Sequence, residues 1–154
     1  MVRIAGMSFV LLAVSLALSW AWQHGALADD TLEPAKTLRR PVAMTLSPDE
    51  SRLYVANRDA GSISVIDAEK LTLLSETIVG KRVTDVATHD AAHLLVTDEA
   101  AHELLVVKIH GEKLSVVSRL PVSPYPQDIE LSADGSTAYV SSLWPRQISV
   151  IDLK

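Results

Sequence analysis

The chain has 154 residues, 48% of them hydrophobic and 21% charged, and its formal net charge is −5. This length gives room for about one domain, and the acidic balance disfavours nucleic acid as a partner because phosphate contacts need a basic surface. The sequence contains no cysteine, which excludes disulfides, thiolate metal sites and haem attachment through a Cys-x-x-Cys-His motif within this chain.

The first 28 residues have the pattern of a secretory signal peptide. Arg3 precedes an apolar stretch that begins at Ile4, and the small-residue segment Ala26-Leu27-Ala28 ends it. An uncleaved membrane anchor is the alternative, since residues 4–22 could just span a bilayer. We expect residues 1–28 to be removed on export, which predicts a periplasmic or extracellular protein. Because Arg3 is the only charge removed, the formal net charge becomes −6.

Residues 29–40 are expected to form a linker or, over 31–38, the outer strand that closes a ring, although Pro34 weakens a strand there. A unit of four short strands follows over residues 41–82. Its third strand, 62–67, alternates apolar and polar residues, and turn-favouring residues separate the strands. The strands expected in this unit are 42–46, 52–57, 62–67 and 71–79.

Two further units repeat the first, at spacings of 41 and then 44 residues. Residues 53–57 and 62–67 return almost intact at 138–142 and 147–152, and in a degenerate form at 94–98 and 103–108. A period near 40 with several short strands in each unit is typical of propeller blades. The sequence therefore predicts an all-β fold, a partial β-propeller of about two and three-quarter four-stranded antiparallel blades. The predicted units are 41–82, 83–126 and an incomplete 127–154.

A family resemblance rests on these repeats. Leu53-Tyr54-Val55-Ala56-Asn57, followed by residues 62–67, resembles the YVTN-type β-propeller repeat of exported bacterial proteins, and Ser47-Pro48-Asp49 and Ser132-Ala133-Asp134-Gly135 are similar to the turn of that family. The resemblance covers residues 41–154, and the second unit departs from it in its histidine-rich turns. It implies an extracytoplasmic propeller, often a binding or surface module and sometimes fused to a c-type cytochrome, but no one reaction.

The turns of an antiparallel meander lie alternately on two rims. Those after strands two and four of each unit share one rim, which is richer in arginine and aromatic residues, and the opposite rim is richer in carboxylates. Arg and Trp are the residues most often found at binding hot spots, so we expect the first rim to face a protein partner or a small anionic ligand. The candidate partner-binding residues, which we call the Arg/aromatic rim, are Arg58, Arg82, Tyr125, Trp144 and Arg146.

The histidines and serines of the chain form no recognisable catalytic or metal-binding pattern. His89 and His93 are four residues apart, a spacing that binds zinc on a helix, but here they flank a turn and lack a third ligand. The sequence has no Gly-x-Ser-x-Gly elbow and no phosphate-binding loop. We expect no catalytic residue, no metal ligand and no cofactor in this chain.

The acidic residues of the turns are expected to have structural roles. Asp67 and Asp152 occupy equivalent positions in two units and are expected to accept hydrogen bonds from the turns that follow them. Two adjacent pairs, Asp49-Glu50 and Asp98-Glu99, are expected to be exposed in turns and to stay ionised.

These observations favour an exported, non-catalytic propeller module that presents a rim for binding. One alternative is the N-terminal part of a propeller–cytochrome c type oxidoreductase whose haem region lies outside this chain, and another is a fragment of a lactonase-like propeller enzyme. A membrane contact is expected only through the signal segment if it is not cleaved. Three blades are too few to close a ring, so the remaining blades are expected from sequence beyond this chain or from another chain.

Overall fold

The computed structural model describes residues 38–154, which form eleven β-strands and no helix. Within this part of the chain no helix is long and apolar enough to cross a bilayer. The predicted signal peptide and residues 29–37 of the predicted linker or closing strand lie outside the described residues. Residues 38–40, which are described, have no regular structure.

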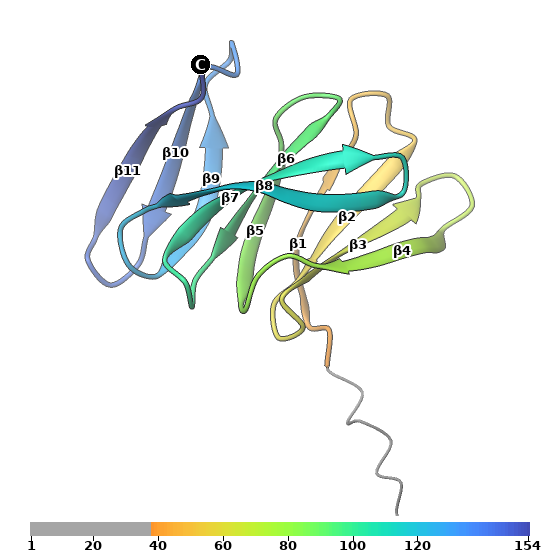
Figure 1. Cartoon of the computed structure of the whole chain (residues 1–154), viewed down its shortest axis with the longest axis horizontal. Coiled ribbons are helices and arrows are strands. Elements are labelled where there is room, and N and C mark those ends of the chain that lie inside the picture. Colours follow the sequence, from red (N-terminus) through yellow and green to blue (C-terminus); the bar gives the residue numbers. More distant parts are fainter. Residues whose placement is uncertain (1–37) are drawn as a thin grey trace, which may run out of the picture. The chain divides into compact units, whose positions relative to one another are not determined.

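The strands form three separate antiparallel sheets, each a simple meander (Figure 1). The first sheet contains β1 (Pro41–Leu46), β2 (Arg52–Asn57), β3 (Ser62–Asp67) and β4 (Thr72–Ile78). The second contains β5 (Val83–Thr88), β6 (His93–Asp98), β7 (Glu103–His110) and β8 (Lys113–Pro121). The third contains β9 (Pro126–Leu131), β10 (Thr137–Ser142) and β11 (Gln147–Asp152). The predicted fold class, an all-β partial β-propeller, is confirmed.

The strand ends follow local chemistry that recurs in the sheets. In the β1–β2 turn the Ser47 hydroxyl donates to the Asp49 carboxylate at 2.5 Å and accepts from the backbone N–H of Arg52 at 2.9 Å. The hydrogen bond from Ser47 is the largest of the effects that lower the pKa of Asp49 to about 2. In the β9–β10 turn Asp134 has the same arrangement with Ser132, and its pKa is likewise lowered to about 2.

The predicted role of Asp67 and Asp152, which end the third strands of the first and third sheets, is confirmed. Asp67 accepts from the backbone N–H groups of Glu69 and Lys70 at 3.2 and 2.9 Å, and Asp152 accepts from that of Lys154 at 3.0 Å. The strand predicted from residue 71 begins one residue later, because Leu71 has a φ of 55° and belongs to this turn.

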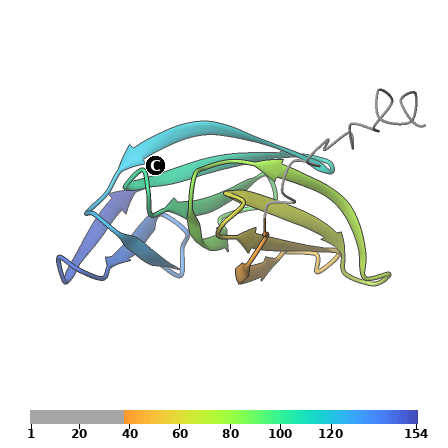
Figure 2. The same cartoon turned by 90° about the horizontal axis from the view of Figure 1, so that it is seen from below.

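Two apolar cores lie between consecutive sheets. The first core joins residues such as Ile63 and Val65 of the first sheet to Leu94 and Val96 of the second. The second core joins the opposite face of the second sheet to the third sheet. The innermost strands β1, β5 and β9 lie next to one another, and Figure 2 shows the outer strand β8 (cyan) on the far side of the sheets from β1 (orange). This is radial stacking of like sheets, as in a propeller.

The four-residue turn between the second and third strands of each sheet closes with a left-handed residue. Its φ is 61° at Gly61, 60° at His102 and 55° at Arg146. In the first sheet this residue also meets the connection to the second sheet, because the Gly61 carbonyl accepts from the N–H groups of Val79 and Gly80 at 2.9 and 3.0 Å. A Cβ atom at Gly61 would lie 2.2 Å from the Gly80 carbonyl oxygen.

The crowding at Gly61 predicts that Gly61→Ala is severely destabilising. We expect the free energy of unfolding to fall by about 2–5 kcal/mol, because the added methyl group must displace the Gly80 backbone while the residue keeps a left-handed φ. Gly111→Ala is the matched control, since Gly111 has a φ of 63° but no neighbouring atom within 4 Å of the place that a Cβ would occupy. Urea denaturation should show a loss of only about 1 kcal/mol for that variant. Equal losses for the two variants would contradict the packing argument.

Candidate functional site

The five residues of the Arg/aromatic rim lie at the same ends of the three sheets. The strand register pairs Asn57 with Ser62 in the first sheet, Asp98 with Glu103 in the second and Ser142 with Gln147 in the third, which puts the three equivalent turns on one rim. The connections between sheets enter at these ends as well. The rim is therefore assembled from turns whose backbone is fixed by the strands beneath them.

A repeated backbone hydrogen bond ties each of these turns to the residues before the first strand of its own sheet. The N–H of Arg58 donates to the Arg40 carbonyl at 3.0 Å, and that of Glu99 donates to the Arg82 carbonyl at 2.9 Å. In the third sheet the N–H of Leu143 donates to the Tyr125 carbonyl at 3.2 Å. The same bond in three sheets gives the rim a regular backbone framework.

Arg58 is held by an ion pair within the rim. Its guanidinium donates to the Glu99 carboxylate, and the two side chains retain 19% and 12% of their accessible surface. Arg58 and Glu99 occupy the same position in successive turns, so this pair joins the first sheet to the second. A partner would have to compete with Glu99 for the Arg58 guanidinium.

Tyr125 lies where the second and third sheets meet on the rim. Its backbone N–H donates to Nδ1 of His102 at 3.2 Å, and the two rings make an edge-on contact with centroids 5.1 Å apart. Tyr125 directly precedes β9 and has a left-handed backbone, with a φ of 59°. Its side chain is 43% exposed, so one edge contacts His102 and the rest is open to a partner.

Trp144, Arg146 and Arg82 are the rim residues with free side chains. Trp144 is 72% exposed and its neighbour Leu143 is 59% exposed. Arg82 and Arg146 are exposed, and neither forms an ion pair with any residue between 38 and 154. An apolar side chain and two unpaired cations on fixed turns are suited to binding a partner that offers both apolar surface and negative charge.

The expectation that Asp98 is an exposed turn carboxylate is wrong. Asp98 is completely buried, because it ends β6 beneath the connection between the first two sheets. Its carboxylate accepts from the backbone N–H groups of Lys81 and Arg82 at 2.7 and 3.1 Å, and from those of Ala100 and Ala101 at 3.1 and 3.3 Å. Asp98 therefore fixes the connection and its own turn together.

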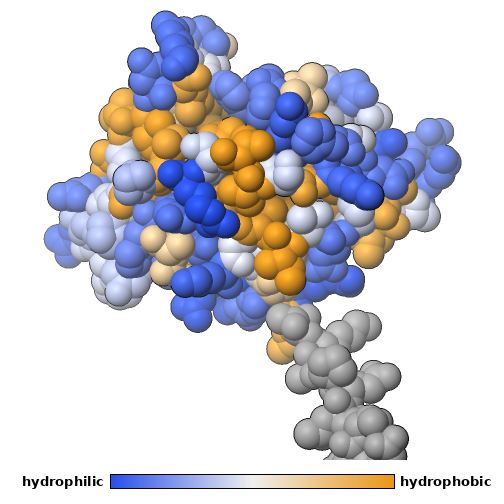
Figure 3. All heavy atoms as spheres, viewed as in Figure 1, coloured by the Kyte–Doolittle hydropathy of each residue, from blue (hydrophilic) through white to orange (hydrophobic). Residues whose placement is uncertain are grey.

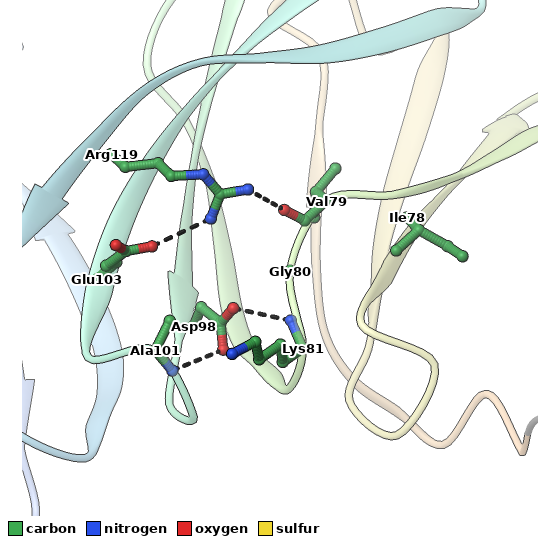
Figure 4. A pocket seen from close by; sticks show the side chains of 8 residues that line it. All are labelled: Ile78, Val79, Gly80, Lys81, Asp98, Ala101, Glu103 and Arg119. Atoms are coloured by element: carbon green, nitrogen blue, oxygen red, sulfur yellow. Dashed lines mark hydrogen bonds and ion pairs between the residues drawn. The ribbon is translucent and has the colours of Figure 1, made fainter.

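A pocket of about 450 Å³ opens beside this connection (Figure 4). On one side Arg119 of β8 donates to the Glu103 carboxylate at 3.0 Å and to the Val79 carbonyl at 3.2 Å. Lys81 and the apolar side chain of Ile78 also line it. The pocket has both signs of charge at its edge, and the sequence alone does not reveal it because its walls come from two different sheets.

Two aspartates on the innermost strands also belong to no motif that the sequence analysis identifies. Asp85 of β5 accepts from the backbone N–H of Ile129 on β9 at 2.8 Å, so it links the second and third sheets. Burial raises the pKa of the Asp85 carboxyl, and the nearby carboxylate of Asp128 raises it further. The two occupy equivalent positions in successive units, which the repeat spacing could have indicated.

The histidines that flank the β5–β6 turn contact Asp90 and form no metal site. Nδ1 of His93 lies 3.1 Å from both carboxylate oxygens of Asp90, and Nε2 of His89 lies 3.9 Å from the nearer one. Between residues 38 and 154 no group of three or more His, Cys, Asp or Glu side chains is placed to hold a metal ion.

Solved structures with the same arrangement of sheets are β-propeller proteins. Hydrazine synthase of Kuenenia stuttgartiensis is 30% identical over 75% of this chain, with a TM-score of 0.68, and the match covers 33% of that chain. The periplasmic gluconolactonase of Pseudomonas aeruginosa is 19% identical over 74% of this chain, with a TM-score of 0.66, and the match covers 36% of it. The β-propeller domain of Myceliophteria thermophila Cps50 is 13% identical over 73% of this chain, with a TM-score of 0.58, and the match covers 39% of it.

The last two structures support the fold alone, because their sequence identities are low. The chain spans only about a third to two-fifths of the length of these three proteins. No protein-family model matches the sequence, and no curated protein matches it.

The buried carboxylate predicts that Asp98→Asn is destabilising. We expect the free energy of unfolding to fall by about 2–4 kcal/mol, because an amide brings donor hydrogens to a site that already holds four backbone donors. Asp59→Asn is the control, since Asp59 is exposed on the same rim and lies 3.7 Å from Arg40. Thermal or urea denaturation should show a change of less than about 0.5 kcal/mol for the control. A similarly small change for Asp98→Asn would contradict the assigned role.

The raised pKa of Asp85 predicts a distinct dependence of stability on pH. Its folded-state pKa lies above the ordinary value of 3.8, so the folded state holds this proton more tightly than the unfolded state. The resulting stabilisation is present below pH 3.8 and is lost as the pH rises through the folded-state pKa. The stability of the natural protein relative to Asp85→Asn should therefore fall with rising pH over this range, as measured by urea denaturation at a series of pH values. A relative stability that rises with pH would show that the sign is wrong.

Proposed function

We propose that this chain is an exported, non-catalytic β-propeller module that binds a protein partner through its Arg/aromatic rim, or a small anionic ligand at the same place. The observation that carries this proposal is the exposed pair Leu143 and Trp144 beside Arg146, which has no ion pair with any described residue. Tryptophan and arginine supply much of the binding energy at protein interfaces, and this surface presents both.

The rigidity of the rim supports this function. Its turns are tied to the strands by the repeated backbone hydrogen bonds, and the Arg58–Glu99 pair and the His102–Tyr125 contact join neighbouring sheets. A surface that is already ordered loses less conformational freedom when it binds a partner. The exposed side chains of Arg82 and Trp144 are thus displayed on a fixed framework.

An extracytoplasmic location is part of the proposal. It rests on the signal-peptide pattern of residues 1–28, and it accords with the periplasmic gluconolactonase among the structures with this fold. The resemblance to the exported YVTN-type repeat family points to the same location. A purified exported chain that begins after residue 28 would support cleavage.

The rim proposal predicts site-specific crosslinking. With p-benzoylphenylalanine at position 144, irradiation of cells that export the chain should give an adduct with one partner. Arg82→Glu with Arg146→Glu should reduce this adduct about tenfold, because the cations that attract the partner are reversed. The matched control is Lys70→Glu with Lys113→Glu, which changes the charge by the same amount on the opposite rim.

Two results would contradict the rim proposal. One is equal crosslinking from p-benzoylphenylalanine at position 134, on the opposite rim, and the other is an adduct that survives charge reversal at Arg82 and Arg146. The enzymatic alternative is tested separately with gluconolactone as substrate. Hydrolysis above the spontaneous rate that is lost in Asp85→Asn would replace the proposal with the lactonase-like alternative.

A further inference from the structure

The pocket beside the connection between the first two sheets is lined by polar side chains whose positions recur in the first sheet. These side chains are Lys81, Asp98, Glu103 and Arg119. The strand register and the backbone hydrogen bonds of the rim give their counterparts, in the same order, as Arg39, Asn57, Ser62 and Glu76. The first sheet therefore shows one way in which charges at these positions can be balanced.

In the first sheet a carboxylate lies between these side chains. Glu76 accepts from Nε of Arg39 at 2.8 Å and from the Ser62 hydroxyl at 2.7 Å. The hydrogen bond from Arg39 is the largest of the effects that lower the pKa of Glu76, and that from Ser62 is the next. The cation of this set is thus paired with the carboxylate of the same set.

In the second sheet the cation at the equivalent position has no such carboxylate. Arg119 stands where the first sheet has Glu76, and it forms its ion pair with Glu103 at 3.0 Å. Lys81 stands where the first sheet has Arg39, is exposed, and forms no ion pair with any residue between 38 and 154. Asp98 does not balance it, because that carboxylate is completely buried and accepts from four backbone N–H groups.

The pocket offers further donors and an apolar wall beside Lys81. Arg119 donates to Glu103 and to the Val79 carbonyl, and a guanidinium has more N–H groups than these two bonds use. Ile78 lines the pocket and is 77% exposed. Figure 3 shows apolar surface directly beside strongly hydrophilic surface in the middle of the face over which β8 runs in Figure 1. The volume of about 450 Å³ is within the usual range for a small ligand.

From this comparison of the two sheets we infer that the pocket binds a small monocarboxylate that carries an apolar group. Its carboxylate accepts from the Lys81 ammonium and from the free N–H groups of Arg119, as Glu76 accepts from Arg39 in the first sheet. Its apolar group packs on Ile78.

The carboxylates in the wall of the pocket restrict the charge of the ligand. Asp98 and Glu103 disfavour a ligand with a second negative charge, because like charges in close proximity repel each other. The site involves neither Trp144 nor Arg146, so this inference does not depend on the function proposed for the rim.

The first experiment titrates the purified full chain with 3-phenylpropanoate and follows binding by NMR. Saturable binding at one site is expected. The amide 3-phenylpropanamide has nearly the same shape without the charge, and it should bind at least about tenfold more weakly because it makes no charge-assisted hydrogen bond. Lys81→Gln should weaken binding of the acid by about the same factor. Lys113→Gln is the control, since Lys113 is an exposed lysine of the same sheet on the opposite rim, and it should leave binding unchanged.

A second variant tests the comparison of the two sheets directly. Glu103→Ser/Arg119→Glu copies the first sheet into the second, so that the introduced carboxylate pairs with Lys81 as Glu76 pairs with Arg39. Binding of 3-phenylpropanoate should be lost in this variant, and circular dichroism verifies that it folds. If it does not fold, Lys81→Gln alone decides, because this residue is exposed.

Four results would overturn the inference. They are the absence of saturable binding, equal binding of the acid and the amide, binding that survives Lys81→Gln or the folded double variant, and inorganic phosphate that binds as tightly as the acid.

Discussion

The structure depends on one constraint: each four-stranded meander of this repeat is apolar on both faces. Both faces of such a sheet are removed from water only when another sheet packs on each side of it. The middle sheet is packed in this way. Its residues Leu94 and Leu95 are adjacent in sequence, point in opposite directions and are both completely buried. The hydrophobic effect therefore stabilises the stack of sheets rather than any one sheet, and the polar residues lie in the turns that form the rims.

The fold was predictable because this constraint repeats the same pattern of apolar, polar and turn residues in each unit. Alternation and turn residues located strands such as Arg52–Asn57 and Ser62–Asp67 to the residue, and the spacing of the copies indicated the propeller. The parity of the meander predicted that Arg58 and Trp144 lie on one rim. The small error at Leu71 arose because a left-handed residue extends the turn, and a leucine gives no local signal of that conformation.

The details of the candidate site were less predictable because they depend on how neighbouring sheets are staggered. Asp98 looks like any acidic turn residue, and its burial follows from the path of the connection over its carboxylate. The pocket beside Arg119 needs walls from two sheets. The Arg58–Glu99 and Asp85–Asp128 relationships join equivalent positions of successive repeats, so alignment of the copies contains that information. Comparing the residues at equivalent positions of successive units would have identified both relationships.

The left-handed residue that closes each rim turn affects which amino acids can occupy that position. In the first sheet it is Gly61, which adopts the conformation without steric cost, whereas His102 and Arg146 adopt it with a side chain. Each of these two sacrifices about 1 kcal/mol of stability relative to glycine. His102 recovers part of that loss through Tyr125, but Arg146 has no ion pair among the described residues to offset it. Glu50 and Leu71 on the opposite rim have the same left-handed backbone, so this conformation admits a side chain wherever a Cβ atom has room. At position 61 the approach of the Gly80 backbone removes that room, and this contact is what makes glycine necessary there.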